Sequence, residues 1–174
     1  AAHRSSVEER YGPYADALLE VYPADGPVVP KTGRDLARDA AFGWHTWSWA
    51  RLQSEKGSSK VFLYYFDQHP EYPEGSPRYG FGSPHGQDVD FVFKALKEEA
   101  CDTDFELSDI MATYWTNFAK YGDPNGDSLP EWPEFTKDNH VTMVLTGDKP
   151  YPSAVPDEDA MWVLNSYFEW RRNQ

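Results

Sequence analysis

The sequence has little cysteine, few positive charges and no long apolar run. A single cysteine, Cys101, cannot form an intrachain disulfide or a cysteine-rich zinc site. The apolar runs, such as 61–66, are far shorter than a membrane-spanning helix. Only 16 Lys and Arg stand against 29 Asp and Glu, which gives a formal net charge of -13. Such a surface repels phosphate backbones and anionic lipid heads, so neither nucleic acid nor a membrane is expected as a partner.

Aromatic residues are abundant by contrast. Of the 174 residues, 40% are hydrophobic and 16% are aromatic, including seven Trp. Aromatic side chains bury large areas, so the chain has enough apolar surface for one or two folded units. No basic segment followed by an apolar core begins the sequence, so any signal peptide would lie upstream. The compartment stays open, and a secreted or periplasmic location is compatible with such an upstream signal.

The first half predicts helices followed by one core strand. Residues 5–22 favour two short helices divided by Gly12-Pro13, and 35–53 favours a longer helix with Asp35 as a possible cap. Residues 61–66 are β-branched and aromatic without alternation, which is typical of a strand covered on both faces in a mostly parallel sheet. A long Pro- and Gly-rich loop follows, and loops of this length are often functional.

The second half predicts mostly helices. Val89, Val92, Phe93 and Leu96 share one apolar face of a short helix. A longer helix is expected over 108–121, capped by Ser108 and ended by Gly122. Beyond it, 141–145 indicates a strand and 157–172 a final amphipathic helix.

His85 is the residue most suited to chemistry. It ends the long loop that follows the expected strand, and Gly86 lets the backbone turn tightly behind it. A histidine in such a place can serve as a general base, or it can simply be a loop side chain bonded to a nearby carboxylate. Position alone favours the second interpretation.

Several segments resemble type-B carboxylesterases, the family of bacterial para-nitrobenzyl esterases and cholinesterases. The resemblance is carried by Gly82-Ser-Pro-His85-Gly86-Gln-Asp88-Val-Asp-Phe91-Val-Phe93, by Lys60-Val-Phe-Leu-Tyr-Tyr-Phe-Asp67 before it, and by Met111-Ala-Thr-Tyr-Trp115-Thr-Asn-Phe-Ala-Lys-Tyr-Gly-Asp-Pro-Asn125-Gly126 after it. Tyr11 to Pro23, Leu129 to Pro133 and the closing helix are similar too. These matches run in the family's order along nearly the whole chain.

The resemblance implies an α/β fold: the C-terminal part of an α/β-hydrolase, with few strands and flanking helices. Residues 1–174 would be the C-terminal segment of a carboxylesterase catalytic domain. It would consist of a helical region (1–59), the core strand and histidine loop (60–93), and C-terminal helices with a strand (94–174). The implied activity is serine-dependent hydrolysis of a small carboxylic ester, with His85 as the catalytic base and without a metal or other cofactor.

The chain departs from the full family pattern. It has no Gly-x-Ser-x-Gly and no glycine-rich run that could form an oxyanion hole. Glu8 and Glu9 lie past the family's acidic motif, and Asp88 replaces its usual glutamate after His-Gly. We interpret Asp88 as helix capping or support of the histidine loop. The isolated chain is therefore expected to be inactive, and either to self-associate or to pair with the missing N-terminal part.

Other interpretations use other residues. His85, Asp88 and Asp90 could in principle ligate a metal, although residues so spaced near a helix start do not point to one face. The cluster Trp44, Trp47 and Trp49 could form a carbohydrate-binding module, although core packing is the commoner role. Tyr72, Tyr79 and Phe81 could line a substrate entrance or pack within their loop. A non-catalytic adhesion relative of the same superfamily is a further alternative.

Overall fold

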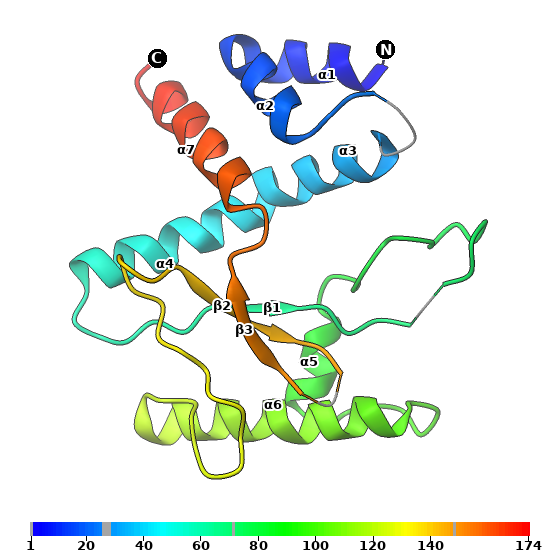
Figure 1. Cartoon of the computed structure of the whole chain (residues 1–174), viewed down its shortest axis with the longest axis vertical. Helices are drawn as coiled ribbons and strands as arrows, with labels where there is room; N and C mark the ends of the chain where they lie inside the picture. Colours follow the sequence, from blue (N-terminus) through cyan, green and yellow to red (C-terminus); the bar gives the residue numbers. More distant parts are fainter. Residues whose placement is uncertain (1, 26–28, 71, 148) are drawn as a thin grey trace. The chain divides into compact units, whose positions relative to one another are not determined.

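The computed structural model describes residues 2–25, 29–70, 72–147 and 149–174, which form two compact units (Figure 1). Unit 1 comprises Ala1–Trp49 and Pro156–Gln174, and unit 2 comprises Ala50–Val155. Unit 1 is helical, whereas unit 2 contains the sheet and the histidine loop. No helix within the described ranges has both the length and the apolar character needed to cross a membrane.

Unit 1 is built from short helices. Its elements are α1 (Ala2–Tyr11), the 3-10 turn η1 (Gly12–Tyr14), α2 (Ala15–Val21), α3 (Val29–Arg38), the π-helical turn η2 (Asp39–Gly43), the start of α4 (Trp44–Lys56) and α7 (Glu158–Arg172). The break expected at Gly12-Pro13 is present as η1. The single helix expected over 35–53 is instead divided by η2, where the backbone winds more widely.

The core of unit 1 lies between α1, α2 and α7. Leu18 on α2 and Leu164 on α7 are completely buried. The Tyr11 and Tyr167 rings meet edge to face with 4.9 Å between their centroids, a favourable geometry for aromatic pairs. Trp44 stacks on Phe168 at 4.1 Å. Aromatic contacts therefore hold the chain's first and last helices together.

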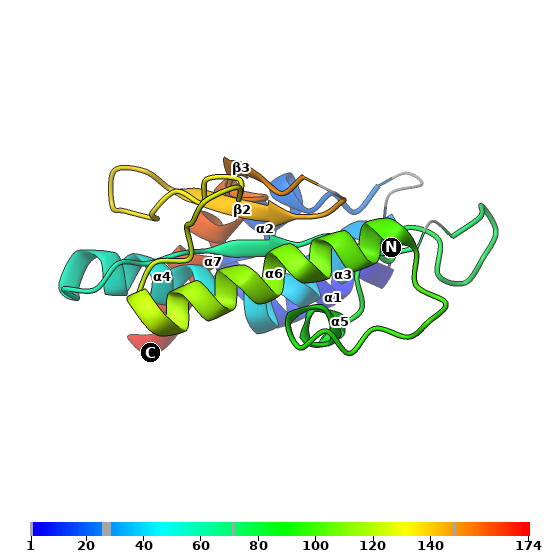
Figure 2. The same cartoon turned by 90° about the horizontal axis from the view of Figure 1, so that it is seen from below.

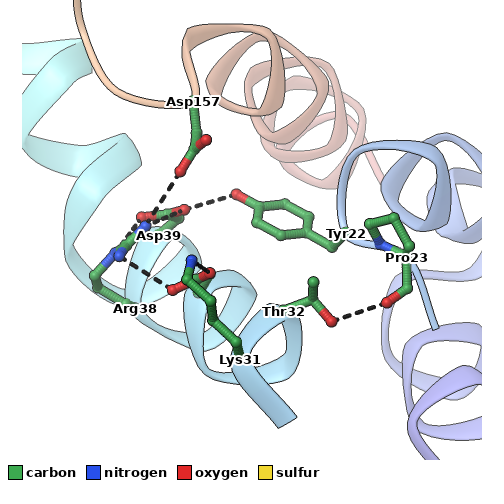
Figure 3. Close-up of polar contacts among 8 residues, drawn as sticks. Tyr22, Pro23, Lys31, Thr32, Arg38, Asp39 and Asp157 are labelled. Carbon is green, nitrogen blue, oxygen red and sulfur yellow. Dashed lines mark hydrogen bonds and ion pairs between the residues drawn. The ribbon is translucent and has the colours of Figure 1, made fainter. Parts of the chain in front are cut away.

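A buried aspartate fixes the π-helical turn. Asp39 is only 2% exposed, and its carboxylate accepts hydrogen bonds from Tyr22 Oη at 2.8 Å and from Arg38 Nε and Nη2 at 2.7 and 2.9 Å (Figure 3). Arg38 also lies 3.6 Å from Asp157 at the start of α7. A Cβ at Gly43 would lie 2.9 Å from Asp39 Oδ1, so the turn needs glycine there. We call Tyr22, Arg38 and Asp39 the buried aspartate cluster.

Unit 2 contains a three-stranded mixed sheet in the order β1-β2-β3. β1 (Tyr64–Phe66) pairs in parallel with β2 (Val141–Leu145), with Tyr64 opposite Met143. β2 pairs antiparallel with β3 (Tyr151–Ala154). The expected strand over 61–66 is thus shorter, and Tyr64 is 36% exposed, so β1 is not covered on both faces as the sequence suggested.

Two helices cover the same face of this sheet (Figure 2). They are α5 (Gln87–Val92) and α6 (Asp102–Tyr121). Their shared core comprises Phe91, Leu107, Met111, Tyr114, Trp132, Met143 and Leu145. α6 begins earlier than expected because Cys101 and Asp104 form a capping box at its start.

Two details of these helices differ from the sequence predictions. Ser108 is not a cap but a buried residue inside α6, and its hydroxyl donates to the Phe91 carbonyl at 2.7 Å. On α5 the buried residue is Phe91, whereas Val89 and Phe93 are exposed. The predicted apolar face therefore forms only in part: Val92 and Leu96 are partly buried and pack against the core of unit 2, and Phe91 is the buried residue of the helix.

Candidate active site

His85 lies in a tight turn at the start of α5. The Gln87 amide donates to the Pro84 carbonyl at 3.2 Å and closes the turn. Gly86 has φ 82° and ψ 1°, a left-handed conformation that suits glycine at the third position of a type II turn. The His85 side chain is exposed.

The loop that carries His85 is tied to the sheet where β1 ends. Ser83 Oγ donates to the Gln68 carbonyl at 2.9 Å, so the two ends of the loop are joined. The Gln68 side chain accepts from Gly147 N at 2.8 Å and donates to Asp104 Oδ1 at 2.7 Å. Gln68 therefore links the carboxyl ends of the parallel pair to the start of α6. The sequence showed no signal for this role, because its partners lie far away along the chain.

Asp88 connects the histidine turn to β1. Its Oδ2 accepts from the Tyr64 hydroxyl at 2.8 Å. Burial, and then this hydrogen bond and the charge of Asp88, raise the pKa of Tyr64 well above its ordinary value, so the hydroxyl stays a proton donor at neutral pH. Of the two roles expected for Asp88, helix capping is wrong, because Gly86 is the N-cap and no side-chain cap bond forms, whereas the bond to Tyr64 is compatible with support of the histidine loop.

The rest of the loop presents aromatic side chains to solvent. Tyr79 and Phe81 are each 56% exposed. Arg78 lies 5.8 Å above the Tyr72 ring and donates to its hydroxyl at 3.4 Å. Figure 1 shows this loop extending away from the sheet.

The other groups singled out in the sequence do not converge. Trp47 and Trp44 are buried at 2% and 7% exposure while Trp49 is 77% exposed, so the three rings form no common platform. Glu8 and Glu9 lie on α1 in unit 1. Within the residues that the structure describes, no three His, Cys, Asp or Glu side chains gather as a set of metal ligands.

An aromatic groove lies beside β1 in unit 2. It has a volume of about 160 Å³ and is lined by Phe62, Tyr64, Tyr114, Trp115, Phe118, Pro124 and Trp132. Tyr64 thus faces this groove with its ring and reaches Asp88 with its hydroxyl. His85 is not among the lining residues, so the groove and the histidine turn are separate features.

Known proteins similar to this chain are esterases. A carboxylesterase family model matches residues 14–158. Carboxylesterase 4A of Bos taurus is 35% identical over 132 residues, which cover 74% of this chain and 24% of that protein. Carboxylesterase 1D of Rattus norvegicus is 34% identical over 132 residues, with 74% and 23% covered. The chain therefore spans about a quarter of the length of these relatives.

Solved esterase structures have the same fold over almost the whole chain. A PNB esterase superposes with a TM-score of 0.70 and 24% identity, covering 92% of this chain and 32% of its own. A Geobacillus stearothermophilus carboxylesterase gives a TM-score of 0.70 and 20% identity, covering 92% and 34%. This confirms the expected partial α/β-hydrolase fold. Because the family model spans most of the sequence, the chain belongs to the carboxylesterase family, as its resemblance to type-B members predicted.

Proposed function

We propose that this chain is the C-terminal part of a serine-dependent carboxylic ester hydrolase in which His85 is the general base. The observation that carries the proposal is the exposed imidazole on a glycine turn, reached by the loop from the carboxyl end of a parallel strand. Active sites of open α/β sheets lie at that edge. Membership of the carboxylesterase family supports ester hydrolysis as the reaction.

In this mechanism His85 moves one proton twice in each half-reaction. It takes the proton of a seryl hydroxyl while the serine oxygen bonds to the ester carbonyl carbon, and the carbonyl oxygen becomes an oxyanion. When the oxyanion collapses, the carbon–oxygen bond to the alcohol breaks, and His85 protonates the leaving alcohol. Water then repeats the sequence on the acyl-enzyme and releases the acid. The serine and the oxyanion donors come from polypeptide outside these 174 residues.

The isolated chain is inactive in this proposal. Its sequence contains no Gly-x-Ser-x-Gly elbow, so no acyl-enzyme can form on it. The purified chain is expected to give no hydrolysis of a chromogenic nitrophenyl ester above the buffer rate. Hydrolysis that a serine-directed inhibitor blocks, and that His85→Ala leaves unchanged, would contradict the proposal.

The full-length protein tests His85 directly. His85→Ala is expected to lower kcat by at least about 1000-fold, because the base acts in every proton transfer. His69→Gln is the matched control, since His69 lies in the same loop, with its Nδ1 3.1 Å from the neighbouring Pro70 carbonyl and its Nε2 3.8 Å from Asp67. This control should keep its kcat. Equal activity of His85→Ala and the unchanged protein would reject the assignment.

We also propose that the isolated chain self-associates or pairs with the N-terminal part of the protein. Among the described residues, no strand pairs with the second edge of β1, and Tyr64 of β1 also lines the aromatic groove. An unpaired strand edge next to apolar surface is a template for association. Light scattering of the purified chain should give a mass that rises with concentration. A constant monomer mass at high concentration would count against this proposal.

A further inference from the structure

α5 is too short to hold itself in place. It spans six residues, its N-cap makes no side-chain hydrogen bond, and both Val89 and the C-cap residue Phe93 are exposed. A helix of this length is unstable by itself, so contacts with the rest of unit 2 determine where it lies. The orientation of the turn before it, which carries His85, depends on the same contacts.

The contacts that fix this segment include four hydrogen bonds or ring contacts, of which three reach β1 or Gln68, two residues beyond its end. Ser83 is bonded to the Gln68 carbonyl on one side of His85. On the other side, Asp88 accepts from Tyr64 at 2.8 Å, and the Phe91 ring packs against Phe66 at 5.1 Å. The fourth contact is the Ser108 bond to the Phe91 carbonyl.

The Tyr64–Asp88 bond is the anchor nearest to His85 on the helix side. Asp88 follows the histidine by three residues, just after the left-handed N-cap Gly86, whereas Phe91 lies three residues farther along α5. Tyr64 is part of β1 itself, and its phenol donates the hydrogen bond of 2.8 Å to Asp88 Oδ2. A donor on β1 is thus bonded to an acceptor in the first turn of α5, directly after the turn that carries His85.

We propose that Tyr64 and Asp88 are positioning residues for His85, holding the catalytic turn against β1 at the distance that proton transfer requires. The inference rests on the proposed role of His85. Small displacements of a catalytic group are costly, and about 1 Å can lower a rate about 100-fold. Losing the bond should therefore reduce the chemical step while leaving substrate binding intact.

The first experiment uses the full-length protein. Tyr64→Phe and Asp88→Ala are each expected to lower kcat by about 10-fold to 100-fold, with KM changed by less than about twofold. The kcat of the double variant should be no lower than that of the less active single variant, because both substitutions remove the same hydrogen bond. Asp88→Asn keeps an acceptor oxygen at the same length, so its kcat should stay within about threefold of the unchanged protein.

Two matched controls exclude general effects of these substitutions. Tyr121→Phe removes a hydroxyl from a tyrosine on α6 that is 74% exposed. Asp90→Ala removes an exposed carboxylate from α5 itself. Both should keep kcat and KM. A loss of kcat in Asp90→Ala equal to that in Asp88→Ala would show that charge or helix content matters, and would overturn the proposal.

The second experiment uses this chain alone. Amide hydrogen exchange over residues 84–90 should quicken in Tyr64→Phe and Asp88→Ala and return to the original rate in Asp88→Asn. Unchanged exchange rates in Tyr64→Phe and Asp88→Ala would contradict the proposal that this hydrogen bond holds the turn in place. If His85→Ala abolishes activity while Tyr64→Phe and Asp88→Ala keep full kcat, positioning fails and the catalytic role stands. If His85→Ala is active, the proposed function fails instead.

Discussion

Each unit contains a tyrosine that donates a hydrogen bond of 2.8 Å to an aspartate, but the two bonds lie in different surroundings. In unit 1, Tyr22 and Asp39 are 3% and 2% exposed, and Arg38 adds two more bonds to the same carboxylate. In unit 2, Tyr64 is 36% exposed, and its bond to Asp88 in the first turn of α5 is open to solvent. Equal lengths therefore do not imply equal contributions to stability.

The difference comes from water. When a buried hydrogen bond is broken, the abandoned partner finds no replacement, and the full cost of its desolvation appears. At a partly exposed site, water takes the vacant place and most of the loss is recovered. The buried aspartate cluster should thus stabilise the fold, whereas the Tyr64–Asp88 bond should mainly determine where a turn lies.

Asp39→Ala should have the largest effect on stability. It leaves the buried Tyr22 hydroxyl without its acceptor and removes the carboxylate that accepts two hydrogen bonds from Arg38, so we expect the free energy of unfolding to fall by about 3 kcal/mol. Urea unfolding followed by tryptophan fluorescence measures this change. A fall no larger than that caused by Asp16→Ala, at the exposed start of α2, would remove the distinction between the two bonds.

Tyr22→Phe should have the next largest effect, about 1 to 2 kcal/mol, since it removes one bond and leaves Arg38 on the carboxylate. It also changes the response to alkali. Burial, followed by the charge of Asp39, raises the pKa of Tyr22 above its usual value of 10.0. The stabilisation that the protonated Tyr22 hydroxyl gives to the fold is therefore fully present below about pH 10 and is lost as the pH rises further.

Thermal unfolding between pH 8 and pH 11, in steps of about half a unit, tests the alkaline part. The unchanged chain should lose stability faster than Tyr22→Phe over this range. Some loss should persist in the variant, because the pKa values of Tyr64 and Tyr114 are also raised, chiefly by burial. Identical alkaline profiles for the two proteins would contradict the prediction.

Tyr64→Phe should change stability by less than about 1 kcal/mol, because solvent reaches this bond. The same substitution is expected to lower kcat in the full-length protein. Urea unfolding of Tyr64→Phe and Tyr22→Phe compares the two hydrogen bonds directly, because both substitutions remove one tyrosine hydroxyl. A larger loss in Tyr64→Phe than in Tyr22→Phe would reverse the ranking of the two bonds.

Asp123→Asn should have the smallest effect, visible only as a change with pH. The Lys60 ammonium at 2.7 Å, and then the Asn125 amide, lower the pKa of the Asp123 carboxyl below its usual 3.8. Its stabilisation is present above that value and is lost as the pH falls through the lowered pKa. Melting temperatures between pH 6 and pH 2 should converge for the two proteins at the acid end, with Asp127→Asn as the exposed control. A difference in melting temperature that grows as the pH falls would contradict the prediction.

Features that depend on neighbouring residues could be predicted from the sequence. Gly122 ends α6 in the left-handed conformation, and β2 occupies the expected 141–145. The two helices divided at Gly12-Pro13 are present as predicted, and Leu18 and Leu19 on the second of them are buried. Each of these outcomes follows from local turn chemistry or from a short run of apolar residues.

Features that depend on distant partners could not be predicted. Ser108 looked like a cap, but its hydroxyl meets the carbonyl of Phe91 on another helix. β3 was missed because Tyr151-Pro152 reads as a link, although proline is tolerated on an edge strand. The motif drew attention to His85, but the Tyr64–Asp88 anchor joins residues on either side of the long loop and has no local signature.

The mixed sheet also has a consequence for how unit 2 assembles. β2 and β3 are near neighbours in the sequence, so their pairing closes a short loop. Pairing of β1 with β2 instead closes the long segment from Asp67 to His140. The long closure costs more chain entropy and is slower. During refolding, amides of the β2–β3 hairpin should gain protection before those that join β1 to β2. The turn that carries His85 lies within this long closure and is bonded to Tyr64 of β1 through Asp88, so it should reach its final place only when β1 pairs with β2.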